Sequence, residues 1–459
     1  MDPYISLVDL ARAYRAGTTT PSRVTRALLD RIERLEPRIG AFQAVYADEA
    51  MRAADAATHA IASGHAIGPF HGIPFGLKDI CDLEGRITTG GSKAMADRVS
   101  PVTGTVTARL IAAGGIVLGK TKTVECAYGG WGTNQHMGTP WNPWDIGTHR
   151  APGGSSAGSG AAVAAGMAIC AVGTDTGGSV RLPSAFCGLT GLKTTEGQLP
   201  TDGILPLSHT LDTPGPMARS VEDAAVMYQV MAGAEAHEIS HGLAARTGIF
   251  ASIDRGAQGL VLGILTEQER LACSADVLAA YDKALDELSG LGAVLKPFVP
   301  PTPFAETTVE IGRIMSAEAY YHHGALYDDP EAPMDEDVRP RMLAGKSISA
   351  AEYLGLLASR RQAMEDFSVA MRGFDAVLTP SMTSTAPSVA DLDQSVSPAH
   401  FTRTFNYLAM CALALPTGPA ADGLPTSLQI AARGGDEAMV LRIGAALERV
   451  QPAPNWPRL

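Results

Sequence analysis

The 459-residue sequence predicts an α/β fold in which helices cover a β-sheet. Short apolar runs separated by glycine-rich loops fill residues 70–217, a texture typical of buried strands. After them, helix-like segments alternate with strand-like ones, as in α/β proteins. Hydrophobic residues make up 46% of the chain and charged residues 18%, which excludes a disordered protein. No linker or repeat divides the sequence, so we expect one domain over residues 1–459, with a core at about 70–217 and a variable, pocket-forming region at about 235–400.

The N-terminal segments predict two amphipathic helices. Leu7, Leu10 and Ala11 share one face of the first. The second begins with Thr20 as N-cap and Pro21 at the first helical position, followed by apolar residues at a helical spacing. Each helix should bury one stripe.

The later elements follow from the same periodicities. Helices are predicted at 220–233, 274–292 and 350–374, and strands at 260–265 and 375–381. Residues 299–348 are rich in proline, acidic residues and methionine, and we interpret them as loops and short helices that cover one sheet edge and form a pocket wall.

Charge and cysteine usage restrict the partners. The net charge of −12 does not favour nucleic acid or an anionic membrane surface, so a small-molecule substrate is expected. The six cysteines are scattered without a C-x-x-C pair, which suits a reducing cytoplasm. The start of the chain does not resemble a signal peptide, and the most apolar stretch, 157–173, is broken by glycines. We expect a cytoplasmic monomer or homodimer.

Three glycine-rich elements carry the chemistry: HGIPFGLKDI at 71–80, PGGSSAGSGAAVAAG at 152–166 and GTDTGGSVRLPSAFCG at 173–188. Gly177 and Gly178 directly precede Ser179, where their freedom of dihedral angle allows an unusual turn. Serine is a weak nucleophile that needs a base, and a buried, neutral lysine can supply it. Lys78 alone would be interpreted as an ordinary lysine, but beside these elements it is a candidate base.

These elements resemble the amidase signature family. Its pattern approximates GIPxxxKD, GGSSGGSAAA and GTDxGGSxRxPAAFCGxxGLKP, and this chain has GIPFGLKD, GGSSAGSGAA and GTDTGGSVRLPSAFCGLTGLKT. The resemblance extends over most of residues 5–450. It implies the amidase signature fold, a mixed central β-sheet with helices on both faces, and a hydrolase that cleaves carbon–nitrogen bonds other than peptide bonds.

The resemblance also implies the roles of individual residues. Ser179 would be the acylated nucleophile, Ser155 the relay serine held by a cis peptide, and Lys78 the base. The backbone N–H groups of 176–179, namely Thr176, Gly177, Gly178 and Ser179 itself, would form the oxyanion hole. Asp175 and Arg181 would shape the loop, and no metal or organic cofactor is implied.

Substrate contacts are expected at Tyr128, Gly129 and Gly130, since positions near 122–130 lie close to the acyl pocket in this family. The chain departs from the usual pattern at Ile80, Lys122 and Ala157, which leaves the substrate open among amides, anilides, lactams, ureas and carbamates, including those of urethanases. The alternative is a glutamine-hydrolysing amidase subunit of a tRNA-dependent amidotransferase-like complex.

Two other motifs suggest different chemistry. Gly154–Gly158 spells G-x-S-x-G, which would make Ser156 the nucleophile of an elbow, although no histidine stands in a comparably specific context. Residues 237–241 spell H-E-x-x-H, a zinc motif when it lies on a helix. No third ligand is evident and a helix ends near Gly233, so a solvated loop is predicted there.

Overall fold

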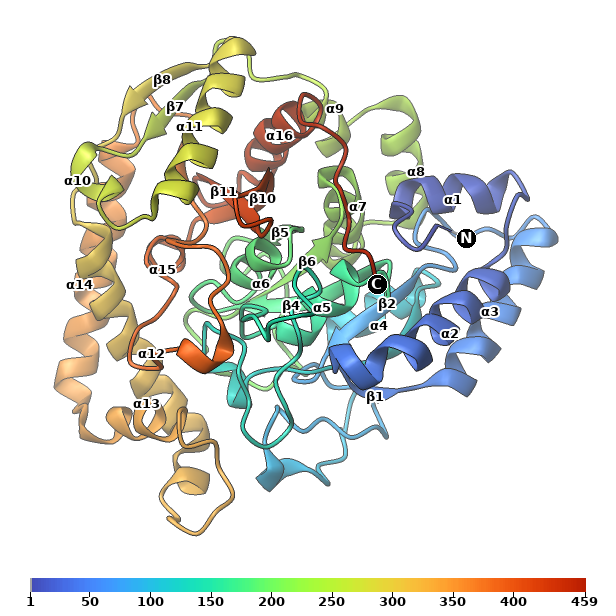
Figure 1. Cartoon of the computed structure of the whole chain (residues 1–459), viewed down its shortest axis with the longest axis horizontal. Coiled ribbons are helices and arrows are strands. Elements are labelled where there is room, and N and C mark those ends of the chain that lie inside the picture. The colour runs from blue at the N-terminus through green and yellow to red at the C-terminus, as the bar shows by residue number, and fades with distance from the viewer. Residues whose placement is uncertain (1) are drawn as a thin grey trace.

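One mixed β-sheet runs through the computed structural model, which describes residues 2–459 (Figure 1). Within these residues eleven strands hydrogen-bond in the order β1-β3-β2-β4-β6-β5-β10-β11-β9-β7-β8. The strands are β1 (Phe42–Val45), β2 (Pro74–Lys78), β3 (Ile116–Thr121), β4 (Cys170–Asp175), β5 (Thr190–Lys193), β6 (Thr213–Ala218), β7 (Val261–Ile264), β8 (Val294–Pro297), β9 (Ala376–Pro380), β10 (Cys411–Pro419) and β11 (Pro425–Ala432).

The sheet is mixed, as the family resemblance implied. β2 lies parallel to both β3 and β4, whereas β4 pairs antiparallel with β6. The C-terminal hairpin of β10 and β11 inserts between β5 and β9, where both contacts are antiparallel. Strands far apart in the sequence, such as β5 and β10, therefore lie side by side in the middle of the sheet.

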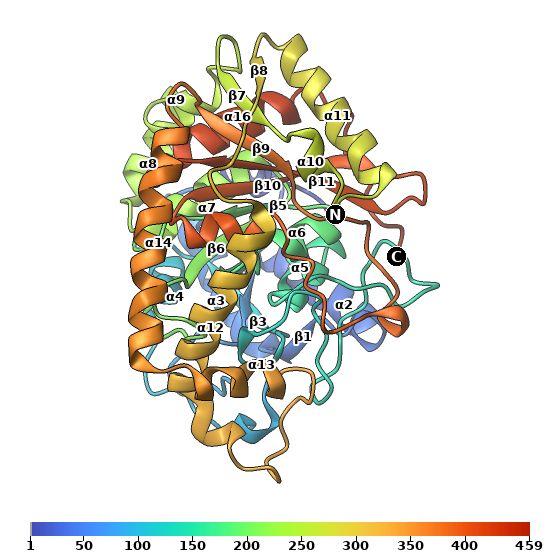
Figure 2. The same cartoon turned by 90° about the vertical axis from the view of Figure 1, so that its left-hand side faces the viewer.

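Helices cover the sheet and extend beyond its edges (Figures 1 and 2). They are α1 (Leu7–Arg15), α2 (Pro21–Ile39), α3 (Ala47–Ala62), α4 (Thr105–Ala112), α5 (Ala157–Ala164), α6 (Arg181–Phe186), α7 (Val221–Ala232), α8 (Ala236–Ala245), α9 (Ile249–Ile253), α10 (Glu267–Arg270), α11 (Ala275–Gly290), α12 (Phe304–Tyr327), α13 (Arg339–Leu343), α14 (Ala350–Ala370), α15 (Thr402–Tyr407) and α16 (Glu437–Glu448).

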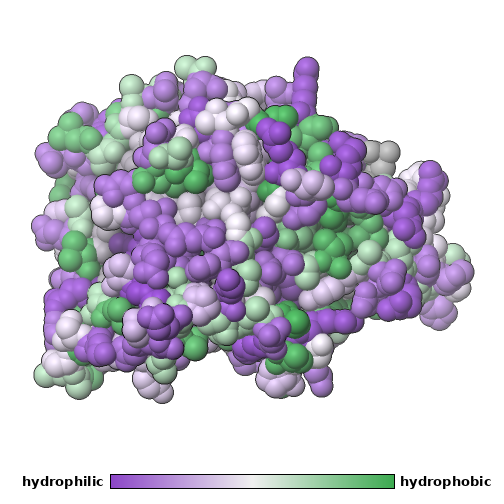
Figure 3. Space-filling view, turned by 60° about the horizontal axis from the view of Figure 1, so that its bottom comes forward, coloured by the Kyte–Doolittle hydropathy of each residue, from purple (hydrophilic) through white to green (hydrophobic). Residues whose placement is uncertain are grey.

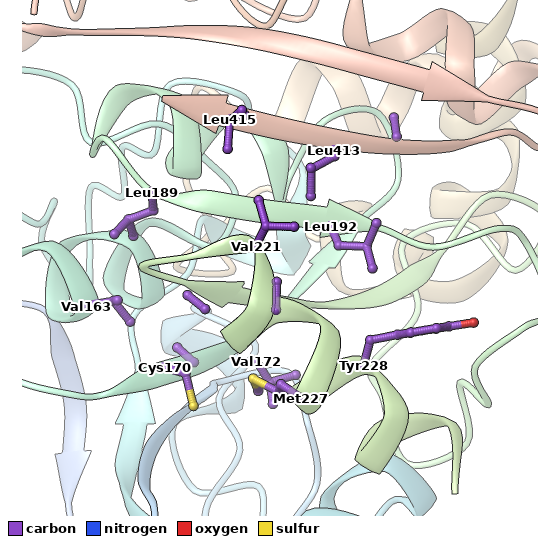
Figure 4. Packing of buried hydrophobic residues seen from close by; sticks show 14 of the residues in the cluster. Val163, Cys170, Val172, Leu189, Leu192, Val221, Met227, Tyr228, Leu413 and Leu415 are labelled. Carbon is purple, nitrogen blue, oxygen red and sulfur yellow. The ribbon is translucent and has the colours of Figure 1, made fainter. Parts of the chain in front are cut away.

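Strand β5 shows how both faces of the sheet are covered. Successive side chains of a strand point to opposite faces. Leu192 and its cross-strand partner Leu413 lie on the face packed by α7 and α16, in the cluster of Figure 4. On the other face a β-carbon at Gly191 would lie 2.2 Å from Ser184 Oγ of α6, so only glycine fits there. The expectation of helices on both faces is confirmed.

The N-terminal helices form as predicted. The Thr20 side chain accepts a hydrogen bond from the N–H of Arg23 and caps α2, with Pro21 at its first position. Helix α1 is held by Asp223, whose carboxylate accepts the N–H groups of Leu7 and Val8 at 2.9 and 3.1 Å. The two chain ends lie side by side, since Tyr4 stacks on Trp456 at a ring distance of 5.4 Å.

Two expectations from the sequence are wrong. Residues 299–348 contain α12, a 24-residue helix that begins directly after Pro303, rather than short helices alone. Its buried Ile311, Ile314, Met315 and Ala319 recur at helical spacing, a signal that the surrounding prolines obscured. Residues 237–241 lie on α8 and not in a loop, because Glu235 and Glu238 form a capping box that starts a new helix just after α7.

The surface contrasts with this core. On the face shown in Figure 3, hydrophilic side chains cover most of the area and hydrophobic ones form separate patches. Among the helices of residues 2–459, none combines the length and the hydropathy that crossing a membrane requires.

The central packing yields a stability prediction. Leu413 is fully buried, and we expect Leu413→Ala to lower the free energy of unfolding by about 3 kcal/mol, because it removes apolar contacts and leaves a cavity. Leu354→Ala on α14 is a matched control, since that leucine is 63% exposed, and it should cost less than about 0.5 kcal/mol. Urea denaturation measures both. Equal effects would contradict the placement of β10 in the core.

Candidate active site

Lys78 is the last residue of β2 and is completely buried. Its Nζ donates to Ser155 Oγ at 2.7 Å and to Thr174 Oγ1 at 2.8 Å. Thr174 lies on β4, the strand parallel to and beside β2. The pairing of these two strands therefore places Thr174 beside Lys78. The structure thus brings together two of the three predicted catalytic side chains.

Ser155 precedes helix α5, and the Gly154–Ser155 peptide bond is cis. Its neighbour Ser156 points elsewhere. The Ser156 hydroxyl donates to the carbonyl of Thr174 and accepts the N–H of the same residue, both at 3.3 Å. Ser156 is therefore tied to the backbone of β4, which does not suit the nucleophile of an elbow.

Ser179 lies in the turn between β4 and α6, and its side chain borders a cavity. The Ser179 carbonyl accepts the N–H of Ser156 at 3.3 Å, which joins the two serine loops through their backbones. Within residues 2–459 the Ser179 hydroxyl has no hydrogen-bond partner. The link from Lys78 to Ser155 is thus formed, and the Ser179 hydroxyl is free.

A buried ion pair shapes the Ser179 turn, as expected for Asp175 and Arg181. Arg181 Nη2 lies 2.8 Å from Asp175 Oδ1, and neither side chain is exposed. Asp175 also accepts the N–H groups of Gly178 at 2.7 Å and Val180 at 3.1 Å. Burial raises the pKa of Asp175, but the Arg181 charge outweighs it and holds that pKa well below its usual range.

Backbone donors around Ser179 are the candidates for an oxyanion hole. The N–H of Gly178 is already engaged by Asp175. Among the described residues, no group accepts the N–H of Thr176, Gly177 or Ser179. These three N–H groups are therefore the ones open to a substrate oxygen.

Burial also prepares the lysine. It lowers the pKa of Lys78 to about 7, against smaller opposing effects of Cys81, Asp212 and Asp175. Asp212 is itself buried, and burial raises its pKa to about 6. Its carboxylate accepts the Thr176 hydroxyl at 2.5 Å, so it also supports the turn before Ser179.

The cavity beside Ser179 has a volume of about 460 Å³, within the range of small-molecule sites. Tyr128, Gly129 and Gly130, the predicted substrate contacts, all line it, and the Tyr128 hydroxyl lies 2.8 Å from Ser316 Oγ of α12. The segment at 299–348 contributes a wall, as expected. The remaining lining residues are Ala127, Trp131, Gly177, Leu182, Val309, Gly312, Arg313, Met315, Arg341, Ala344, Ser347, Ile348, Glu352, Gln394, Ser395, Val396, Ser397, Pro398, Ala399 and Arg403.

Sequence reasoning missed several of these residues. Thr174 lies in the GTD motif, a signal from which it could have been predicted. The arginines at 313, 341 and 403 belong to no motif, and only the fold brings them to Ser179. The H-E-x-x-H histidines, His237 and His241, are exposed on α8, and among residues 2–459 no group of three potential ligands can hold a metal ion.

Comparison with known proteins defines the class first: the chain is a hydrolase that acts on carbon–nitrogen bonds. It belongs to the amidase family, whose model, described as Amidase, matches residues 23–441. The fold agrees with that of the native peptide amidase from Stenotrophomonas maltophilia, with a TM-score of 0.84, 27% identity and coverage of 99% of this chain and 98% of that one.

Two sequence relatives show the range of activities in the family. The chain is 33% identical to the 2-amino-5-chloromuconic acid deaminase of Comamonas testosteroni, over 97% of this chain and 96% of the relative. It is 35% identical to a subunit of the glutamyl-tRNA(Gln) amidotransferase of Myxococcus xanthus, over 97% of each chain. Family membership therefore leaves the substrate class open.

The depressed pKa of Lys78 predicts the pH dependence. A base must be neutral, and the neutral fraction of a lysine with a pKa of about 7 rises tenfold per pH unit below that value. We expect kcat/KM for a simple amide to rise with that slope up to about pH 7 and to level off above it. A profile that is flat or falls from about pH 5.5 to about pH 9, in a protein that stays folded, would exclude Lys78 as the base.

Asp212 titrates nearby and supplies the control. Its carboxylate favours the charged lysine, so Asp212→Asn removes an effect that raises the pKa of Lys78. The midpoint of the profile should therefore move to lower pH. Complete loss of the pH dependence would instead assign it to Asp212.

Proposed function

We propose that the enzyme cleaves C–N acyl bonds through a covalent acyl-Ser179 intermediate, with Ser155 as relay and Lys78 as base. The observation that carries the proposal is the 2.7 Å hydrogen bond from the Lys78 Nζ to Ser155 Oγ behind a cavity-facing Ser179. Because the pKa of Lys78 is about 7, a large fraction of the lysine is neutral near pH 7 and can accept a proton.

The proposed cycle has two halves. Neutral Lys78 accepts the Ser155 proton while Ser155 accepts that of Ser179, whose oxygen then attacks the carbonyl carbon. The tetrahedral intermediate expels the nitrogen, which leaves as an amine with a proton returned through Ser155. Water then attacks the acyl-Ser179 ester along the same relay and releases the acid. The N–H groups of Thr176, Gly177 and Ser179 stabilise the oxyanion in both halves.

The proposed substrates are small amides, anilides or carbamates, not peptide bonds of proteins. A cavity of about 460 Å³ accommodates a small molecule, and its Ala127–Gly130 wall consists of an alanine, a tyrosine and two glycines. With a carbamate, the intermediate is an alkoxycarbonyl- or carbamoyl-serine, depending on which bond breaks. The urethanase activity is thus a special case of the same mechanism.

Hydrolysis of glutamine within an amidotransferase-like complex is the second candidate. The observation that favours it is 35% identity to a glutamyl-tRNA(Gln) amidotransferase subunit over 97% of each chain. Glutaminase activity that appears only with an added partner protein would support this candidate against a free-standing amidase.

A cytoplasmic location is part of the same proposal. All six cysteines are unpaired, and five of them are buried. A reducing compartment such as the cytoplasm suits that state. We also propose that the enzyme acts as a monomer or homodimer without a partner protein.

Serine variants test the mechanism on a panel of a nitroanilide, an aryl carbamate, an aliphatic amide and glutamine. We expect Ser179→Ala to lower kcat by at least about 10³-fold on every substrate cleaved, and Ser155→Ala to do the same, because the relay is lost. Ser156→Ala, the matched control, should retain most activity. If only Ser156→Ala abolishes turnover, the proposed mechanism is wrong. Separately, the substrate that the wild type prefers identifies the subclass of hydrolase.

A further inference from the structure

The cavity beside Ser179 is lined by three arginines and a single carboxylate. The arginines are Arg313, Arg341 and Arg403, and the carboxylate is Glu352. This excess of positive charge belongs to a chain whose net charge is −12. The charge of the cavity lining therefore differs in sign from the net charge of the chain.

Two of the three are used within the protein. Arg313 forms an ion pair with Glu352. Arg341 donates from Nη1 to the carbonyl of Tyr128 at 2.9 Å, and from Nη2 to the carbonyl of Gln394 at 2.6 Å and its side-chain oxygen at 3.1 Å. Arg341 thus joins two segments of the cavity wall.

Arg403 has no comparable partner. Within residues 2–459 the one hydrogen bond of its side chain runs from Nη1 to the carbonyl of Thr308 at 3.4 Å, and no carboxylate lies within 4.0 Å of the guanidinium. Burial lowers the pKa of Arg403, and the Arg341 charge acts in the same direction. A guanidinium nevertheless stays charged in proteins, so Arg403 is a cation in the cavity wall without a counter-ion, and most of its N–H donors have no acceptor among residues 2–459.

The position of Arg403 relates it to the reaction. It lies on α15 beside the Ser179 turn: a β-carbon built on Gly177 would lie 3.2 Å from Arg403 Cγ and 3.7 Å from its Nε. A β-carbon on Gly312 of α12 would lie 3.9 Å from Nη1. The guanidinium therefore stands between α12 and the oxyanion turn, with small residues on both sides.

The planar fork of a guanidinium matches a carboxylate, and a half-buried cation without a counter-ion is costly until an anion binds it. We propose that Arg403 binds a carboxylate carried by the substrate, so that the preferred substrates are small amides whose own molecule also bears an ionised carboxylate, such as monoamides of short dicarboxylic acids. This proposal rests on the proposed function and names its substrate class.

The test compares two amides of similar length, glutaramate and valeramide, which differ in the terminal carboxylate. Wild type should show a kcat/KM at least about tenfold higher for glutaramate. Arg403→Met should reduce that ratio about 10- to 100-fold, chiefly through KM, and Arg403→Lys should restore part of it. Arg361→Met, an arginine exposed on α14 outside the cavity, is the matched control and should leave the ratio unchanged.

A binding measurement separates this proposal from the proposed function. Glutarate should bind the Ser179→Ala protein in calorimetry, and adding Arg403→Met should weaken that binding by the same factor. Cleavage of both amides through Ser179 without a preference for glutaramate, or an equal loss of both in Arg403→Met, would overturn the role of Arg403 and leave the hydrolase intact. If neither amide is cleaved, the proposed function fails for these substrates. Independently of cleavage, glutarate binding that is unchanged by Arg403→Met would overturn the carboxylate site.

Discussion

The buried pair of Asp175 and Arg181 holds the active-site region together. Besides Asp175, Arg181 donates to the Gln429 side chain on β11 at 2.6 Å, and to the carbonyl of Thr402 at 2.8 Å and the side chain of Asn406 at 2.5 Å on α15. One guanidinium thus connects the Ser179 turn to the C-terminal third of the chain. Removing either charge would leave the other buried and unpaired, which typically costs about 3–5 kcal/mol.

The same hydrogen-bond network positions Arg403 in the cavity wall. Thr402 accepts from Arg181 through its carbonyl and donates its hydroxyl to the carbonyl of Gly177 at 2.8 Å. Arg403 is the next residue, so the contacts that shape the turn before Ser179 also fix the backbone from which Arg403 extends. Ser179, the proposed nucleophile, and the proposed carboxylate site therefore share one rigid support, which favours a defined separation between them.

Desolvation has opposite uses within one site. At Lys78 burial prevails over the nearby acids, and its pKa falls to about 7. At Asp175 the adjacent guanidinium prevails over burial, and the carboxylate stays ionised. The difference lies in the partner: Lys78 has two neutral hydroxyls as hydrogen-bond partners, whereas Asp175 has a full opposite charge. A lysine with a lowered pKa and a structural ion pair thus arise from the same buried environment.

The sequence by itself determined local features. The glycine-rich motifs, through their resemblance to the amidase signature, predicted Lys78, Ser155 and Ser179 as catalytic residues. The cap at Thr20 with its apolar period determined α2, because caps and helical periodicity depend on residues close in the chain. The tertiary structure decided the rest. The position of β10 and β11 between β5 and β9, the length of α12, and the meeting of Arg341 and Arg403 at one cavity arise from packing between distant segments. Such contacts leave no periodic signal, since each is set by which faces the whole chain can bury together.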